Sequence, residues 1–196
     1  MDAQDFDAWS KSYDESVLKQ ETYPFAGYDE IVEEVINQTN GQKVLDLGIG
    51  TGNIARQLVE GGLDIIGLDF SEEMLRLANE KIPEADLRLY DANEKLPEFD
   101  HDFDTVIMTY FIHHFHEKRQ EELINQLMKI TKKLIIGDVM TYTASQMEWV
   151  KEKDYKDWDD NEWYITVEHY FELFPDYEIT FIRKSYCSGV LIFTHK

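Results

Sequence analysis

The segment KVLDLGIGTG, from Lys43 to Gly52, constrains the fold of this chain more than any other part of its sequence. Its first half is aliphatic, as in a buried strand, and three glycines then follow at alternate positions. The next residues, 53–59, place apolar pairs at helical spacing. Glycine allows a ligand to approach the main chain, and the first turn of a helix presents unpaired N–H groups. The segment therefore predicts a strand, a ligand-binding turn and a helix.

Two acidic residues accompany this turn. Asp46 lies inside the predicted strand, and a second apolar run, 65–68, ends in Asp69. Asp69 follows Gly48 by about 20 residues, the distance at which a strand–helix–strand unit places a ribose-binding carboxylate. The glycine spacing is G-x-G-x-G, which differs from the G-x-G-x-x-G of dinucleotide enzymes. The pattern therefore favours a nucleoside ligand and disfavours a nicotinamide dinucleotide.

With these features in place, the chain resembles the class I S-adenosylmethionine (AdoMet)-dependent methyltransferases, and in particular small bacterial members of unassigned substrate. The matching motifs are Asp46 to Gly52, Asp69 with Ser71 and Met74, Asp91-Ala92, and Tyr110 to Phe115. The resemblance implies a single α/β domain over residues 1–196. It also implies a doubly wound, Rossmann-like mixed sheet of seven strands, the last one antiparallel, with helices on both faces.

Apolar runs elsewhere are consistent with that architecture. Helices are expected at 28–39 and 116–130, and Ser71 is a suitable N-cap for another helix. Further strands are expected at 87–90, 103–108, 133–139, 177–182 and 189–194.

The resemblance implies AdoMet as the cofactor and assigns residues to it. The implied set is Tyr13, Asp46, Gly48, Gly50, Gly52, Asp69, Phe70, Met74, Asp91 and Ala92. In such enzymes the acid at Asp69 holds the ribose, and Phe70 and Met74 line the adenine pocket. The acid at Asp91 accepts a hydrogen bond from the adenine amino group, and the N–H of Ala92 reads a ring nitrogen. Spacing alone also allows Met74 to be a core residue and Asp91 a solvated turn residue.

The N-terminal segment places four apolar residues three or four apart, namely Phe6, Trp9, Tyr13 and Val17. This spacing predicts one aromatic face of a helix, which could simply pack on the core. The resemblance implies instead that residues 1–27 form a lid helix over the cofactor. Tyr13 would then contact AdoMet or the substrate.

Three candidates for catalysis follow the strand at 103–108, beyond the carboxyl end where α/β sheets place their chemistry: Tyr110, His113 and His114. They could act as a general base or position the substrate, and an equally weighted alternative is that a histidine only caps or packs on the next helix. No metal site is predicted, because adjacent histidines are expected to point in different directions. No cysteine or suitably spaced carboxylate completes a ligand set.

Residues 140–172 combine aromatic side chains with many acids. They could form amphipathic helices that cover one sheet edge. They could also form an insert over the substrate side, because they follow the fifth strand at the ligand end of the sheet. Aromatic faces there could hold a cationic or apolar acceptor.

The net charge and the cysteine content limit which classes of partner and which cellular location are expected. The formal net charge of −21 disfavours nucleic acid and anionic membranes as partners. The lone cysteine, Cys187, excludes an internal disulfide framework and fits a cytoplasmic location. No long apolar segment predicts a membrane span. The expected partner is a small-molecule methyl acceptor, and self-association is left open between a monomer and a homodimer.

The sequence thus predicts an AdoMet-dependent methyltransferase that acts on a small molecule by in-line displacement. One alternative is a non-catalytic protein that binds or senses AdoMet. A nicotinamide-dependent oxidoreductase is the other, and the glycine spacing and Asp46 disfavour it.

Overall fold

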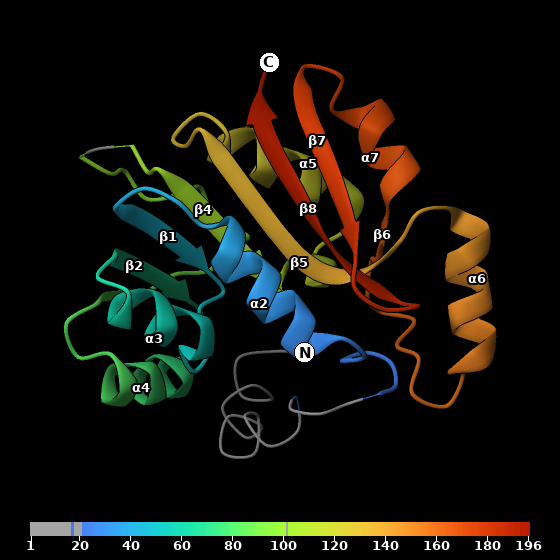
Figure 1. Ribbon diagram of the computed structural model, residues 1–196, viewed down its shortest axis with the longest axis horizontal. Helices are drawn as coiled ribbons and strands as arrows, with labels where there is room; N and C mark the ends of the chain where they lie inside the picture. The colour runs from blue at the N-terminus through green and yellow to red at the C-terminus, as the bar shows by residue number, and fades with distance from the viewer. Residues whose placement is uncertain (1–16, 18–20, 101) are drawn as a thin grey trace.

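A central β-sheet with helices on both faces organises the computed structural model, which describes residue 17 and residues 21–100 and 102–196 (Figure 1). The strands are β1 (Lys43–Leu47), β2 (Asp64–Asp69), β3 (Asp86–Leu89), β4 (Thr105–Thr109), β5 (Lys133–Thr141), β6 (Ile165–Thr166), β7 (Tyr177–Arg183) and β8 (Ser188–His195). The helices are α2 (Tyr28–Gln38), α3 (Asn53–Glu60), α4 (Glu72–Lys81), the 3₁₀ turn η1 (Ile112–His114), α5 (Glu117–Leu127), α6 (Ala144–Lys153) and α7 (Val167–Leu173).

The main sheet has the strand order β3-β2-β1-β4-β5-β8-β7. Strands β1 to β5 pair in parallel, and β8 pairs antiparallel with both β5 and β7. The predicted doubly wound mixed sheet, with its last strand antiparallel, is therefore confirmed. The short strand β6, which pairs in parallel with β5, adds an eighth strand that the sequence did not predict.

Two hydrophobic cores occupy the two faces of the sheet, because successive residues of a strand point to opposite sides. In β5, Ile135 belongs to the core beneath α2 and α3, whereas Leu134 and Ile136 belong to the core beneath α5 and α7. Strands β1, β4 and β5 are buried almost throughout, as is typical of parallel strands covered on both faces. The apolar runs in the sequence reflect this double burial.

Side-chain caps fix where several helices begin. The hydroxyl of Ser71 accepts a hydrogen bond from the N–H of Met74 at 3.1 Å, which confirms the predicted cap of α4. At α6, Thr143 and Gln146 form a reciprocal capping box. These caps supply partners for N–H groups that the first turn of a helix leaves unpaired.

Residues 140–172 form the end of β5, then α6, β6 and α7. The expectation of a pair of helices in this segment is met, and Figure 1 shows α6 and α7 flanking the β7–β8 side of the sheet. None of the described helices combines the length and the apolar character needed to cross a membrane.

The sheet has a topological switch point between β1 and β4. The chain moves from β1 toward β2 and β3 on one side, and from β4 toward β5 on the other. Open α/β sheets bind their ligands in the crevice outside the carboxyl ends of the strands at such a point. The residues that follow β1 and β4, namely the glycine turn and residues 110–114, meet there.

Candidate functional site

The glycine turn after β1 has the backbone geometry that its sequence predicts. Gly48, Gly50 and Gly52 have φ angles of 79°, 55° and 78°, a region that side chains other than glycine rarely adopt. Asp69, at the end of β2, accepts hydrogen bonds from the N–H groups of Gly50 at 2.8 Å and Ser71 at 3.0 Å. The turn after β1 and the end of β2 are therefore held together by one carboxylate.

Asp46 is a buried acid beneath this turn. Its side chain lies inside β1 with an exposed fraction of 2%, and its Oδ1 atom has no hydrogen-bond partner among the described residues. Burial, and after it the charge of Asp69, raises the pKa of Asp46 to about 8. A buried carboxyl oxygen without a partner is costly, so Asp46 marks a place where a donor or a cation from outside the chain would be stabilised.

Two cavities flank the glycine turn. The smaller one, of 30 Å³, is lined by Tyr28, Asp46, Gly48, Ile49, Gly50, Thr51, Asn53, Ile54, Thr109 and Tyr110. The larger one, of 110 Å³, is lined by Leu47, Leu68, Asp69, Phe70, Tyr90, Asp91, Ala92, Asn93, Phe111, His114 and Phe115. The ring of Phe111 lies against the α-carbon of Gly48, where a β-carbon would come within 2.2 Å of it.

Most of the predicted cofactor residues line these two cavities. Asp69, Phe70, Asp91 and Ala92 belong to the larger cavity, and Asp46, Gly48 and Gly50 to the smaller one. Two predicted residues line neither cavity: Gly52 is the N-cap of α3, and Met74 is buried with an exposed fraction of 2%. A third, Tyr13, lies outside the described residues, so its role stays a prediction.

A buried arginine supports the loop at the larger cavity. Arg119, on α5, donates from Nε to the carbonyl of Ala92 at 2.8 Å and from Nη2 to the carbonyl of Glu94 at 2.6 Å. Within that loop, Asp91 accepts from the N–H of Asn93 at 2.8 Å. Two hydrogen bonds from a side chain of α5 therefore hold the main chain around Ala92 in place.

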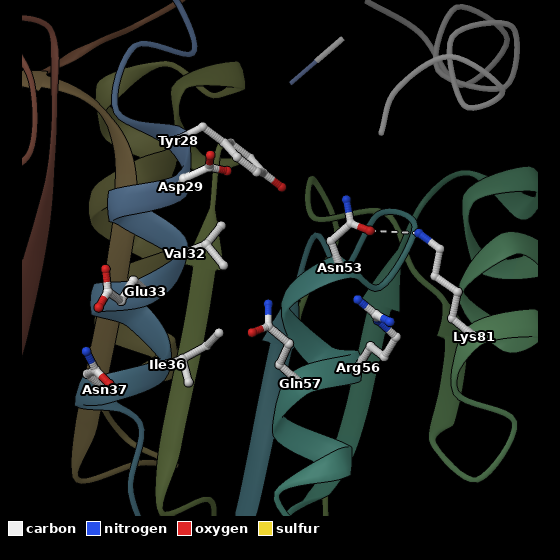
Figure 2. Close-up of a pocket in the computed structure, with 10 residues that line it drawn as sticks. All are labelled: Tyr28, Asp29, Val32, Glu33, Ile36, Asn37, Asn53, Arg56, Gln57 and Lys81. Carbon is white, nitrogen blue, oxygen red and sulfur yellow. Dashed lines mark hydrogen bonds between the residues drawn. The ribbon is translucent and has the colours of Figure 1, made fainter. Parts of the chain in front are cut away.

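A wide groove lies between α2 and α3 and adjoins the smaller cavity (Figure 2). It has a volume of 710 Å³ and is lined by Tyr28, Asp29, Val32, Glu33, Ile36, Asn37, Asn53, Arg56, Gln57 and Lys81. At one end of the groove, Lys81 donates a hydrogen bond to Oδ1 of Asn53 at 2.7 Å. Tyr28 and Asn53 line both spaces, so the groove and the Asp46 cavity meet at these two side chains.

Tyr110 directly follows β4 and has a φ angle of 48°, the one positive value among the described residues other than glycine. Its N–H donates to the carbonyl of Gly137 at 2.8 Å, and its ring packs against Phe25 and Tyr28 at centroid distances of 5.2 and 5.5 Å. Strained backbone of this kind often lies at functional sites. The predicted candidate therefore lines the smaller cavity in a constrained position.

His113 is oriented by a buried aspartate. Its Nδ1 atom lies 2.6 Å from Oδ1 of Asp138, a fully buried residue of β5. Asp138 also accepts from the N–H groups of Phe111 at 3.2 Å and Val139 at 2.6 Å. Burial acts to lower the pKa of His113, but the charge and hydrogen bond of Asp138, followed by the charge of Glu162, outweigh it and raise that pKa.

His114 pairs with a different carboxylate. Its Nδ1 atom lies 3.0 Å from both carboxylate oxygens of Glu162, which precedes β6. Burial and then repulsion from His113 lower the pKa of His114, against the opposing effect of Glu162. The two imidazoles, with ring centroids 4.1 Å apart, therefore differ in how readily they hold a proton.

The geometry corrects one expectation about this pair. The histidines were expected to point in different directions with no carboxylate between them. Instead, His113 Nε2 lies 4.0 Å from Oε2 of Glu162, which His114 also contacts. A main-chain hydrogen bond, from the N–H of Trp163 to the carbonyl of His113 at 2.8 Å, connects the segment with Glu162 to the turn with the histidines. The reason for expecting no metal there therefore does not hold.

An aromatic cluster lies next to the histidines. It consists of Tyr23, Trp158 and Tyr164, with Tyr23 stacked on Trp158 at 5.4 Å and Trp158 edge-on to Tyr164 at 4.7 Å. The ring of Tyr164 lies 5.9 Å from that of His113. Burial first, followed by its contact with Tyr23, raises the pKa of Tyr164, so its hydroxyl stays protonated.

Sequence reasoning did not identify Asp138 and Glu162 as site residues. Asp138 did carry a signal, because it is an acid inside an apolar strand, as is Asp46. Glu162 is one of many acids in its segment and had no such signal. Its contact with His114 joins residues 48 positions apart, which only the tertiary fold brings together.

Comparisons with known proteins identify the family of this chain. A family model described as a methyltransferase domain matches residues 44–133, the segment from β1 to the start of β5. An uncharacterized methyltransferase from Geobacillus sp. is 30% identical over 195 residues, with 92% of this chain and 91% of the relative covered. Another, from Bacillus cytotoxicus, is 31% identical over 141 residues, with 69% of this chain and 66% of the relative covered.

Among solved structures, magnesium protoporphyrin IX methyltransferase from Synechocystis, crystallised with bound S-adenosylhomocysteine (SAH), matches this chain with a TM-score of 0.72 at 17% sequence identity. The match covers the whole of both chains and shows a shared fold. The fold and the glycine-turn site define a class I methyltransferase, as the sequence motifs predicted. The chain belongs to the methyltransferase family.

Proposed function

We propose that this methyltransferase transfers a methyl group from AdoMet to a small-molecule acceptor, with the cofactor bound along the glycine turn. The carboxyl of Asp46 is the main support. Its Oδ1 atom is buried without a hydrogen-bond partner among the described residues, and Asp46 lines the cavity beside Gly48 and Gly50. A cationic group there would relieve the cost of the buried acid. The ammonium of the methionine part of AdoMet is such a group, so these residues fit the cofactor.

The residues that line the larger cavity suit the adenosine part in their chemistry. Leu68 and Phe111 offer apolar faces for a base, and Asp69 and Asp91 offer carboxylates at its edges. We retain the predicted roles, with Asp69 on the ribose hydroxyls and Asp91 on the adenine amino group. The support that Arg119 gives to the Ala92 loop would keep that edge in place.

AdoMet supplies a methyl group on a positively charged sulfur, which is already activated for transfer. An acceptor lone pair forms a bond to the methyl carbon while the carbon–sulfur bond breaks and its electron pair stays on sulfur. Holding the acceptor in line can supply up to about 7–11 kcal/mol of the acceleration. The proton that the acceptor loses would pass to His113, His114 or Tyr110, which follow β4 beside the two cavities.

The acceptor is proposed to enter beneath the segment 158–164, which we assign as the cover of the substrate side. Tyr164 lies beside His113, and Trp158 and Tyr23 pack on Tyr164 and on each other, so aromatic rings would border the acceptor. The predicted lid of residues 1–27 would close the same side, and most of it lies outside the described residues. The net charge of −21 supports a small molecule over a nucleic acid.

The test has a binding arm and a turnover arm. Titration calorimetry with SAH should give one site per chain, and the same titration with NAD should give no heat. Incubation with labelled AdoMet and a size-fractionated extract should place the label in the small-molecule fraction. Label in RNA or protein would contradict the proposed acceptor class, and binding without any turnover would favour the AdoMet-sensing alternative.

A further inference from the structure

His113, His114 and Glu162 form a group of potential metal ligands, which we call the His–Glu cluster. One ligand atom from each residue lies within 4.8 Å of the others. The Nδ1 atom of His114 is 3.0 Å from both oxygens of Glu162, and Nε2 of His113 is 4.0 Å from Oε2. The side chains are 12%, 21% and 7% exposed in sequence order. The cluster is therefore mostly buried, with an opening to solvent at His114.

We propose that the His–Glu cluster binds one divalent transition-metal ion. Two imidazoles and one carboxylate are a donor set that Zn²⁺ and Fe²⁺ accept in proteins. Ligand atoms at about 2.0–2.2 Å from a common ion are separated from each other by about 3–4 Å. The two separations given above fall in this range. Three protein ligands leave at least one position open for another molecule.

Asp138 completes the arrangement from behind His113. Metal-binding histidines commonly donate their second ring N–H to a carboxylate, which fixes the tautomer and the ring orientation. Nδ1 of His113 lies 2.6 Å from Asp138, so the Nε2 lone pair is directed toward Glu162. Asp138 is itself fixed by the N–H groups of Phe111 and Val139. The need to hold the His113 imidazole in the orientation for a metal ion would explain why Asp138 is buried at this position.

The main chain holds the two halves of the cluster in register. The N–H of Trp163 donates to the carbonyl of His113, and Nε2 of Gln120 donates to the carbonyls of Ile112 and Trp163 at 3.1 and 2.7 Å. Gln120 in turn accepts from the hydroxyl of Tyr170 at 2.6 Å. The segment with Glu162 therefore cannot separate from the turn with the histidines without breaking several hydrogen bonds. A metal site needs supporting contacts of this kind.

The simpler interpretation is that protons, and no metal, bridge the cluster. A metal ion would replace those protons, so the two interpretations predict opposite results in a binding experiment. His114 also lines the larger cavity near the glycine turn. An ion there could bind the acceptor atom and promote loss of its proton, and the two histidines would then act as ligands, which leaves Tyr110 as the candidate base. That role rests on the proposed function, whereas metal binding itself does not.

The experiment uses the full chain, stripped with EDTA and then dialysed, with Co²⁺ and Zn²⁺ as probes and Mg²⁺ as the comparison. We expect one Co²⁺ per chain, visible absorption from the bound ion, displacement by Zn²⁺, and much weaker binding of Mg²⁺. Glu162→Gln and His114→Asn should each weaken Co²⁺ binding at least tenfold, and Asp138→Asn by about 10- to 100-fold. His169→Asn is the matched control, because His169 also pairs with a glutamate, Glu117, at 3.0 Å but on the surface.

Circular dichroism and thermal unfolding must first show that each variant is folded. Because two different ligands are replaced, the test still stands if one of these two variants fails to fold. Absence of stoichiometric Co²⁺ binding, or equal binding by wild type and all variants, would overturn the proposal. SAH calorimetry on the same stripped protein separates the two proposals. Protein that binds SAH but no metal overturns only the metal site, and protein that binds metal but no SAH overturns only the cofactor assignment.

Discussion

The carboxylate of Asp138 lies 2.6 Å from Nδ1 of His113, so a residue in the middle of β5 orients a side chain in the turn after β4. The predicted catalytic histidine is therefore part of a chain of contacts that runs from Asp138 through His113 to Glu162. Asp46 plays a different part beside the glycine turn, as a buried acid with one oxygen that has no partner in the part of the chain the structure describes. These two acids give the sharpest tests of the site.

Replacing Asp46 by asparagine should weaken SAH binding about tenfold or more. The proposed ammonium would lose an ionic partner, and hydrogen bonds to charged groups contribute about 1.5–3 kcal/mol. With a pKa of about 8, wild-type Asp46 should also release a proton when the ammonium binds at pH 7. Calorimetry in buffers of different ionisation enthalpy measures that release. Gln57→Ala, in the neighbouring groove, is the control, and an unchanged affinity in Asp46→Asn would contradict the assignment.

The same residue predicts a pH dependence of stability. Because the folded pKa of about 8 lies above the ordinary value of 3.8, the folded protein binds the proton of Asp46 more tightly than the unfolded chain does. This contribution to stability is fully present below about pH 4 and is lost as the pH rises toward 8, by up to about 1.4 kcal/mol per pH unit. Urea unfolding at pH 5.5 and pH 8.5 should show wild type losing more stability than Asp46→Asn. Parallel profiles would show that Asp46 is not protonated in the folded state.

Gly48→Ala should destabilise the protein more than Gly62→Ala. Both glycines have positive φ angles, 79° and 88°, and alanine in such backbone costs about 1–2 kcal/mol. At Gly48 the added β-carbon would also meet Phe111, and overpacking adds about 1–3 kcal/mol, whereas the space beside Gly62 is open. Denaturant unfolding measures both. Equal losses would mean that Phe111 moves aside freely, and Phe111→Ala should then cost the same on the wild-type and the Gly48→Ala backgrounds.

Arg119→Lys should weaken SAH binding and lower stability by about 1–3 kcal/mol, because the carbonyl groups of Ala92, which is buried, and Glu94 would lose a donor. Lysine cannot reproduce the forked contact that arginine makes with the Ala92 and Glu94 carbonyls. Arg56→Lys is the matched control, since Arg56 pairs with Glu60 at 3.9 Å on the exposed side of α3. The prediction is contradicted if the two variants behave alike in calorimetry and thermal unfolding.

Asp138→Asn should reduce methyl transfer at least tenfold while SAH affinity changes less than twofold. If the amide nitrogen takes the place of Oδ1, it loses the hydrogen bond from the N–H of Val139 and can donate to Nδ1 of His113, which favours the wrong tautomer. Formation of SAH under saturating AdoMet gives the rate, and calorimetry gives the affinity. A parallel loss of both would indicate a general structural role for Asp138, in which case thermal unfolding should report the same defect.

Much of the fold could be predicted because it depends on local patterns. The glycine turn, the Ser71 cap and the apolar runs specified β1, α4 and the strands around them within a few residues. Strand β6 was missed because it contains two residues and forms only by pairing with Met140 and Thr141 of β5. Two residues offer no periodicity, so only the folded chain defines this strand.

The cofactor side of the site was predictable for the same reason, and the acceptor side was not. Asp46 and Asp69 adjoin the glycine motif at characteristic spacings, so a local pattern identified them. Glu162 reaches the site only because the segment after α6 folds back over η1. Its segment contains acids at positions 157, 159, 160 and 162, and nothing in the sequence distinguishes the last of these.

The hydrogen bond from the N–H of Trp163 to the carbonyl of His113 also limits how enzymes of this kind could diversify. Because this contact uses only main-chain atoms, substitutions at either position can leave it intact. The side chains that face a bound molecule can therefore vary while the path of the backbone stays the same. Insertions or deletions between α6 and β6 would displace Trp163 relative to His113 and break this contact, so new selectivity should arise through point changes more readily than through changes in loop length.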